Sequence, residues 1–179
     1  MITSENFKRT LAQLAGAVTV ITTRDVLERP WGFTATAFCS LSLDPPLVLC
    51  CLNSNADCYQ AFLHSRAFAV NILSEQQHHL AQRFASKGRA KYHETQFASG
   101  KLGLPLLPDA LATLECSMQH IYPGGDHSII IGLVEYGERV EDGSTAQPLL
   151  YYAQTYGTFT GFPTEPERQN VIHQNGTSV

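Results

Sequence analysis

The chain has 179 residues, of which 44% are hydrophobic and 16% charged, a size and composition typical of one globular domain. Its formal net charge of −4 and its pI near 5.9 argue against nucleic acid as a partner. The opening MITSENFKRT lacks the pattern of a signal peptide, and no apolar run approaches the roughly 20 residues that span a bilayer, so we expect a cytoplasmic protein with no membrane partner.

Three elements are expected before the first proline pair. A helix from Thr3 or Ser4 to Gly16 is indicated by apolar residues that recur on one face and by a glycine placed to end it. Strands over 17–23 and 31–38 are indicated by alternating β-branched and aromatic residues.

The middle of the chain alternates strands with short helices. The sequence Asp-Pro-Pro at 44–46 interrupts regular structure, because proline cannot donate to a strand ladder. The run 47–52 is apolar throughout and predicts a strand buried on both faces. A short helix over about 55–63 and a strand over 68–73 follow, and a capping-box pattern predicts a helix over 75–86.

Two long strands dominate the C-terminal half. After a loop-like stretch over 87–109, the runs 111–122 and 128–140 are rich in β-forming residues. The turn sequence Pro-Gly-Gly-Asp-His between them predicts a hairpin. A last strand is expected over 148–152.

These elements predict a mainly β protein with flanking helices, of the α+β class. Because neighbouring strands are joined by hairpins or one short helix, an antiparallel barrel is favoured over a doubly wound parallel sheet. We expect one domain over 1–162 and a polar C-terminal tail over 163–179.

Several cofactor and metal motifs are missing from the sequence. It contains no G-x-G-x-x-G after a strand, no phosphate-binding P-loop and no G-x-S-x-G turn. The five cysteines include no C-x-x-C pair, and the adjacent His78 and His79 do not match H-E-x-x-H. We therefore expect free thiols and no metal site.

Three segments together carry a family resemblance: 32–48, with its T-A-T-A-F and S-L-D-P-P runs; 68–92, with F-A-V-N-I-L-S, Phe84-Ala85 and Lys91-Tyr92; and 125–152, with the G-D-H turn. In this order and spacing they resemble the short-chain flavin reductase family, which includes reductase components of two-component flavin-dependent monooxygenases. The resemblance runs from about Phe7 to Phe159. It implies an FMN-binding split β-barrel of antiparallel Greek-key type, usually homodimeric, with flavin near the dimer interface.

The resemblance also implies site residues, by position. The groups expected to bind FMN or FAD are Thr34, Ala35, Thr36, Ala37, Ser40, Cys51, Leu52, Asn53, Ser54, Asn55, Phe84, Arg89, Lys91 and Tyr92. Those expected at the nicotinamide are Gly32, Asp126, His127 and Tyr152, with His127 as the catalytic residue. Lys91, with Arg89 nearby, is expected to meet the flavin phosphate, because a dianion needs charge-assisted donors.

The activity that the resemblance implies is NAD(P)H-dependent reduction of FMN or FAD, with reduced flavin passed to a transient partner monooxygenase. The family favours NADH and leaves NADPH open. Two alternatives remain: a reductase whose retained flavin passes electrons to ferric iron or another acceptor, and a non-catalytic flavin-binding electron-transfer protein. A barrel like that of pyridoxamine-phosphate oxidase is disfavoured, because its phosphate-binding arginine cluster is not apparent.

Each assigned residue also has a purely structural interpretation. Thr34 and Thr36 alone would suit the solvated face of a strand. The basic residues of 87–91 alone would suit a solvated loop, and His127 alone would suit a hairpin turn.

Overall fold

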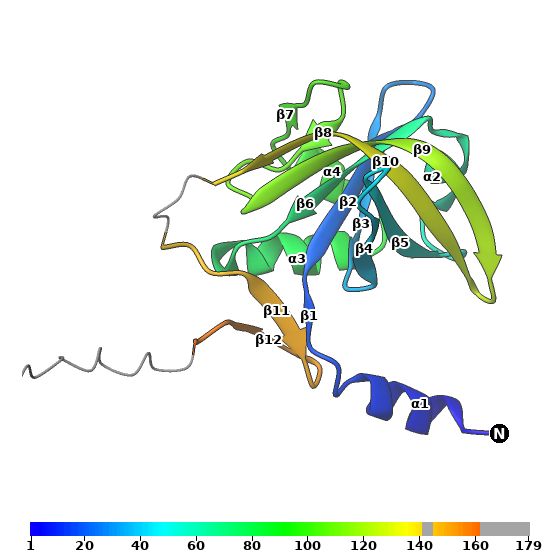
Figure 1. The fold of residues 1–179 in the computed structure, drawn as a ribbon, viewed down its shortest axis with the longest axis vertical. Helices are drawn as coiled ribbons and strands as arrows, with labels where there is room; N and C mark the ends of the chain where they lie inside the picture. Colours follow the sequence, from blue (N-terminus) through cyan, green and yellow to red (C-terminus); the bar gives the residue numbers. More distant parts are fainter. Residues whose placement is uncertain (141–144, 162–179) are drawn as a thin grey trace, which may run out of the picture.

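The computed structural model describes residues 1–140 and 145–161 (Figure 1). The polar tail expected over 163–179 lies outside the described residues. Among the described residues, no helix has the length and apolar character needed to cross a bilayer.

A seven-stranded antiparallel sheet in the order β3-β2-β6-β9-β10-β5-β4 forms the body of the protein. Its strands are β2 (Thr19–Arg24), β3 (Pro30–Ala35), β4 (Phe38–Ser42), β5 (Leu47–Asn53), β6 (Ala67–Ile72), β9 (Ala112–Gly124) and β10 (His127–Arg139). Although β3 and β4 are its two edges, only Thr36 and Ala37 separate them in the chain. The sheet therefore has to curl until its edges meet at this corner, which the Cys51 amide ties to β5 by donating to the Ala37 carbonyl at 3.1 Å.

Two smaller sheets flank the body. β1 (Gly16–Ala17), which follows the N-terminal helix, forms a three-stranded sheet with the late strands β11 (Leu149–Tyr152) and β12 (Thr155–Thr158) (Figure 1). The other small sheet pairs β7 (Ala98–Ser99) with β8 (Pro105–Leu106). The predicted mainly β, antiparallel architecture is confirmed, although the ladder of hydrogen bonds does not close between β3 and β4.

The helices of the described residues are short and lie differently relative to the sheet: the N-terminal one projects away from the body (Figure 1), and the one before β6 contributes Phe62 to the core. They are α1 (Ser4–Leu11), α2 (Tyr59–His64), α3 (His78–Ala85), which continues the 3₁₀ turn Glu75–Gln77, and α4 (Ala90–His93). The predicted capping box starts the 3₁₀ turn that leads into α3, since the Ser74 amide donates to Gln77 Oε1 at 3.1 Å. α3 packs against β3, and the Thr34 hydroxyl donates to the Ala81 carbonyl at 2.6 Å.

The core forms two apolar clusters, one on each side of the β2–β3 hairpin. Inside the curl, Phe33 and Phe62 meet edge to face at 5.2 Å beside buried Phe68. In the second cluster, Phe84 of α3 packs with Val20 of β2. Full burial of each such side chain stabilises the fold by about 1.5–3 kcal/mol.

Two predicted elements are shorter than expected. The N-terminal helix ends at Leu11 rather than near Gly16, because the Ala153 amide donates to the Ala12 carbonyl that a continuing helix would need for itself. The strand predicted over 31–38 is broken at the exposed Thr36 and Ala37, where the chain turns the corner from β3 to β4.

Two other expectations also need correction. β5 is not buried on both faces: Val48, Cys50 and Leu52 point into the core, while the residues between them are half-exposed. The loop expected over 87–109 contains α4, β7 and β8. The hairpin of β9 and β10 and the strand over 148–152 are confirmed, with bounds shifted by at most two residues.

Gly132 on β10 is a position where a side chain cannot fit. A Cβ there would lie 2.5 Å from the Phe68 ring and 2.8 Å from the Cys116 Cβ. Because both neighbours are fully buried, we expect Gly132→Ala to lower the free energy of unfolding by about 1–3 kcal/mol in urea denaturation. Gly157→Ala, whose Cβ meets nothing within 4 Å, is the control. Equal stability of the two variants would contradict this packing.

Candidate functional site

A groove of about 370 Å³ opens where β3, β5, the end of α3 and the tip of the β9–β10 hairpin meet. Its volume lies within the range of roughly 300–1,000 Å³ usual for small-molecule sites. It brings together eight of the residues expected from the sequence: Thr34, Cys51, Leu52, Asn53, Asn55, Phe84, Lys91 and His127. It adds seven that were not expected at the site: Phe33, Ala56, Asp57, Cys58, Ala85, Ser86 and Lys87.

One wall of the groove is fixed by hydrogen bonds between β5 and the hairpin tip. His127 pairs in register with Asn53, and the amide and hydroxyl of Ser54 both donate to the Asp126 carbonyl at 3.0 Å. The Asn53 side chain accepts from the Asn55 amide at 2.8 Å, which shapes the loop after β5. The tip turns at Gly125, whose φ of +74° suits glycine. His127 is therefore held at a defined place beside the groove.

The side chains of His127 and Asp126 form a pair at this wall. His127 Nδ1 lies 2.7 Å from Asp126 Oδ1. The hydrogen bond to His127, and then its charge, lower the pKa of the Asp126 carboxyl. The carboxylate engages one ring nitrogen and so orients the imidazole, leaving Nε2 outside the pair.

The facing wall is basic and comes from the segment that follows α3. Lys91 lines the groove although it is only 7% exposed, and its Nζ donates to the Ser86 carbonyl. Burial lowers the pKa of this amine, while the nearby Cys58 and Asp57 oppose that shift. Lys87 lines the same wall, so two cations face one groove.

Arg89 lies behind this wall and is not among the residues that line the groove. Its guanidinium stacks on the Trp31 ring, 4.3 Å from the centroid, and its buried Nη1 has no hydrogen-bond partner. The Trp31 indole is in turn anchored, since its Nε1 donates to Asp25 Oδ2 at 2.9 Å.

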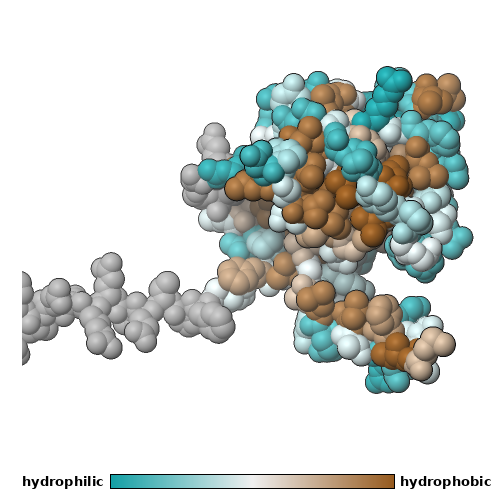
Figure 2. All heavy atoms as spheres, turned by 45° about the vertical axis from the view of Figure 1, so that its right-hand side comes forward, coloured by the Kyte–Doolittle hydropathy of each residue, from teal (hydrophilic) through white to brown (hydrophobic). Residues whose placement is uncertain are grey.

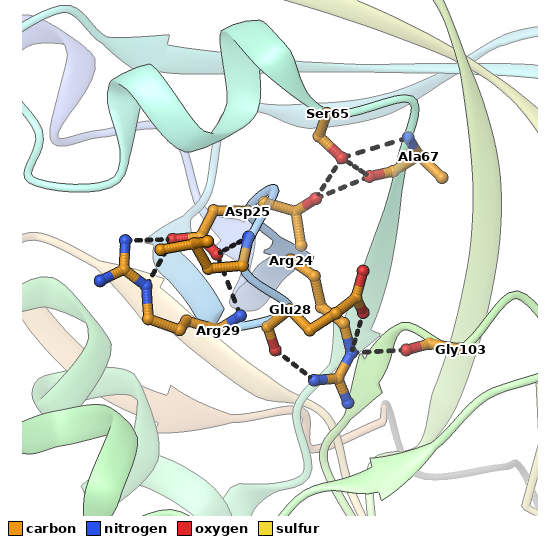
Figure 3. A network of polar contacts seen from close by, with 9 residues as sticks. Arg24, Asp25, Glu28, Arg29, Ser65, Ala67 and Gly103 are labelled. Carbon is orange, nitrogen blue, oxygen red and sulfur yellow. Dashed lines mark hydrogen bonds and ion pairs between the residues drawn. The ribbon is translucent and has the colours of Figure 1, made fainter.

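Asp25, which anchors the Trp31 ring beneath Arg89, is itself the centre of a polar network (Figure 3). Its carboxylate accepts from the Leu27 and Arg29 amides and forms an ion pair with the Arg29 guanidinium at 2.7 Å. Burial by itself would raise the pKa of Asp25, but these hydrogen bonds and that of Trp31 hold it well below its ordinary value. Arg24, alongside, donates to the Gly103 and Glu28 carbonyls (Figure 3).

Several residues expected at the site have other surroundings. Gly32 and Tyr92 are buried and bond each other, the Tyr92 hydroxyl donating to the Gly32 carbonyl at 3.1 Å. Tyr152 lies in the small sheet, where its hydroxyl donates to Gln13. The remaining ones lie outside the groove lining: Ala35 is buried, and Thr36, Ala37, Ser40, Ser54 and Asp126 are exposed.

The groove fits a flavin that carries a phosphate. Two lysines and the Gly88 amide, which already donates to a carboxylate oxygen of Asp57 at 2.5 Å, supply donors of the kind that anions require. Phe33, Leu52 and Phe84 belong to the apolar part of the lining, although their side chains lie almost wholly in the core beneath it. Among residues 1–140 and 145–161, no group of three or more His, Cys, Asp or Glu side chains could hold a metal ion.

Comparison with known proteins gives a consistent result. The model of the flavin reductase like domain matches residues 11–160. The reductase subunit HsaB of a flavin-dependent monooxygenase from Mycobacterium tuberculosis is 36% identical over 174 residues, covering 96% of this chain and 88% of that protein. The NADH:riboflavin 5'-phosphate oxidoreductase of Streptomyces pristinaespiralis is 38% identical over 165 residues, 90% of either chain.

Solved structures agree with this result. The Streptomyces globisporus NADH:FAD oxidoreductase SgcE6, in complex with NAD and FAD fragments, superposes with a TM-score of 0.80 at 30% identity. The match covers 89% of this chain and 96% of that one.

The Asp25 network generates a prediction about acid stability. Because the folded state depresses the pKa of Asp25, its carboxylate stabilises the fold above the ordinary pKa of about 3.9, and this contribution is lost as pH falls through and below that value. We expect Asp25→Asn to be less stable at pH 7 in urea and to lose less stability on acidification to about pH 3. Glu28→Gln, at a carboxylate 82% exposed, is the control. If Asp25→Asn loses as much stability on acidification as the wild type, Asp25 is not a source of the acid dependence.

Proposed function

The chain belongs to the flavin reductase-like domain family, and on that premise we propose that it is an NAD(P)H-dependent flavin reductase that transfers a hydride from nicotinamide to FMN or FAD. The observation that carries the proposal is the groove, in which a basic wall faces an oriented histidine across apolar surface. The relatives named as NADH:flavin oxidoreductases support NADH as the donor, with NADPH left open.

Different side chains bind the flavin and orient the nicotinamide. Lys87, Lys91 and the Gly88 amide hold the flavin phosphate, while Phe33 and Phe84 border the ring. His127, oriented by Asp126, positions the nicotinamide at the hairpin end of the groove. The bound flavin supplies the hydride acceptor, and the reaction depends on the placement of the two rings more than on a protein acid or base.

The reduced flavin is consumed by a partner flavin-dependent monooxygenase. This part of the proposal is supported by relatives named as reductase components, HsaB among them and also the 4-hydroxyphenylacetate 3-monooxygenase reductase component of Thermus thermophilus. We place the protein in the cytoplasm, since all five cysteines, which lie in the described part of the chain, are free thiols.

A homodimer is the assembly that the surface favours. The outward residues of β5 and β10 pair in register as a half-exposed apolar stripe: Leu47 with Leu133, Leu49 with Ile131, and Cys51 with Ile129. Figure 2 shows hydrophobic surface on this side of the molecule and along α1, where Phe7 and Leu11 are half-exposed. Monomers rarely leave such a continuous apolar area in water. Sedimentation as a 19.7 kDa monomer would contradict this assembly.

Steady-state kinetics with NADH and free FMN or FAD test the activity. We expect multiple turnovers that saturate with free flavin, and a kcat in His127→Ala lower by roughly tenfold or more, because nicotinamide placement is lost while flavin binding is kept. His64→Ala, at an exposed histidine at the end of α2, is the control.

Two outcomes favour the alternatives. Turnover with ferric complexes but not with free flavin indicates a reductase that retains its flavin. Flavin binding without turnover, with either flavin and either nicotinamide nucleotide, indicates a non-catalytic carrier and contradicts the proposed reductase activity.

A further inference from the structure

A carboxylate stands within the basic part of the groove. Asp57, in the loop between β5 and α2, lines the groove together with Lys87 and Lys91. Its Oδ2 accepts the Gly88 amide hydrogen at 2.5 Å, which joins the loop after β5 to the basic segment. The only carboxylate among the described residues that line the groove thus lies beside its cations.

The Gly88 amide belongs to a turn suited to binding an anion. Gly88 has φ +100° and no atom within 4 Å of the place where a Cβ would be, so the backbone here is open. A turn with positive φ presents backbone N–H groups to an anion, and flanking lysines add charge. The Asp57 carboxylate therefore takes a donor that a phosphate oxygen would use.

The Asp57 carboxylate also acts electrostatically on Lys91 in the same wall of the groove. Lys91 is buried, and the Asp57 carboxylate is one of the groups that favour its protonated form. In the same segment, Arg89 Nη1 is buried without an acceptor. The basic segment thus has hydrogen-bonding capacity that the chain alone does not fully use.

We propose that Asp57 is an internal competitor for the flavin phosphate and sets the affinity for phosphate-bearing flavins. This inference rests on the proposed function. A phosphate that enters the groove displaces the carboxylate from the Gly88 amide and meets its negative charge at close range. Asp57 thereby keeps flavin affinity moderate, as a reductase that must release its reduced flavin requires.

Binding of FMN and of riboflavin to Asp57→Asn tests this inference. The substitution keeps an oxygen acceptor for Gly88 and removes only the charge, at an exposed position where the fold tolerates change. By flavin fluorescence quenching, we expect the Kd for FMN to fall by roughly tenfold, and that for riboflavin, which has no phosphate, to change less than about twofold. The inhibition constant of inorganic phosphate against FMN should also be lower in the variant than in the wild type.

Glu138→Gln is the matched control, because it removes one negative charge from a side chain 69% exposed that does not line the groove. Its ratio of FMN to riboflavin affinity should equal that of the wild type.

Three outcomes overturn the inference. Equal weakening of FMN and riboflavin in Asp57→Asn shows that the carboxylate shapes the groove. Weaker FMN binding alone shows that it orients the lysines, and unchanged affinities for both flavins show that it has no role in binding. These are binding measurements, so they remain distinct from a failure of the proposed function, which appears as absent turnover in the wild type.

Discussion

The structure depends on a connection of two residues between the edges of its main sheet. Thr36 and Ala37 link β3 to β4, which lie at opposite ends of the strand order. A chain this short spans only about 10 Å, so the edges must meet and the sheet must curl around Phe33, Phe62 and Phe68. The same curl brings the end of β5 beside β3, and the groove opens at this junction.

The two walls of the groove differ in how firmly they are held. The wall of β5 and the hairpin tip is tied by ladder bonds and by Ser54, which fixes the turn that carries His127. The wall of 86–91 rests on stacking of Arg89 over Trp31 and on single bonds from Lys91 and Gly88. A firm wall for the rings and a basic wall with unused donors suit a ligand that binds, reacts and leaves.

Much of this arrangement could be predicted from the sequence, because alternating apolar residues determine strands and the G-D-H turn determines the hairpin. Thr34, Phe84, Lys91 and His127, which the family resemblance assigns to the cofactors, line one groove, and their roles stay predictions. The break at Thr36 could not be predicted, since the alternation continues through it and only the strand pairing reveals the corner. The place of Asp57 in the groove could not be predicted either, because a carboxylate in a polar loop is common. Its position is explained only by its hydrogen bond with the Gly88 amide, which is distant in the sequence. Gly32 and Tyr92 were expected at the cofactors; in the structure they are hydrogen-bonded to each other outside the groove lining, and their roles stay predictions.

The central claim is that this groove holds flavin with its phosphate at the basic wall. A crystal structure of the protein with FMN tests it most directly. The account predicts the phosphate beside Lys91 and the Gly88 amide, the ring between β5 and Phe84, and the Asp57 carboxylate moved away from Gly88. FMN bound elsewhere, or in this groove with its phosphate turned away from the 86–91 segment, would contradict it.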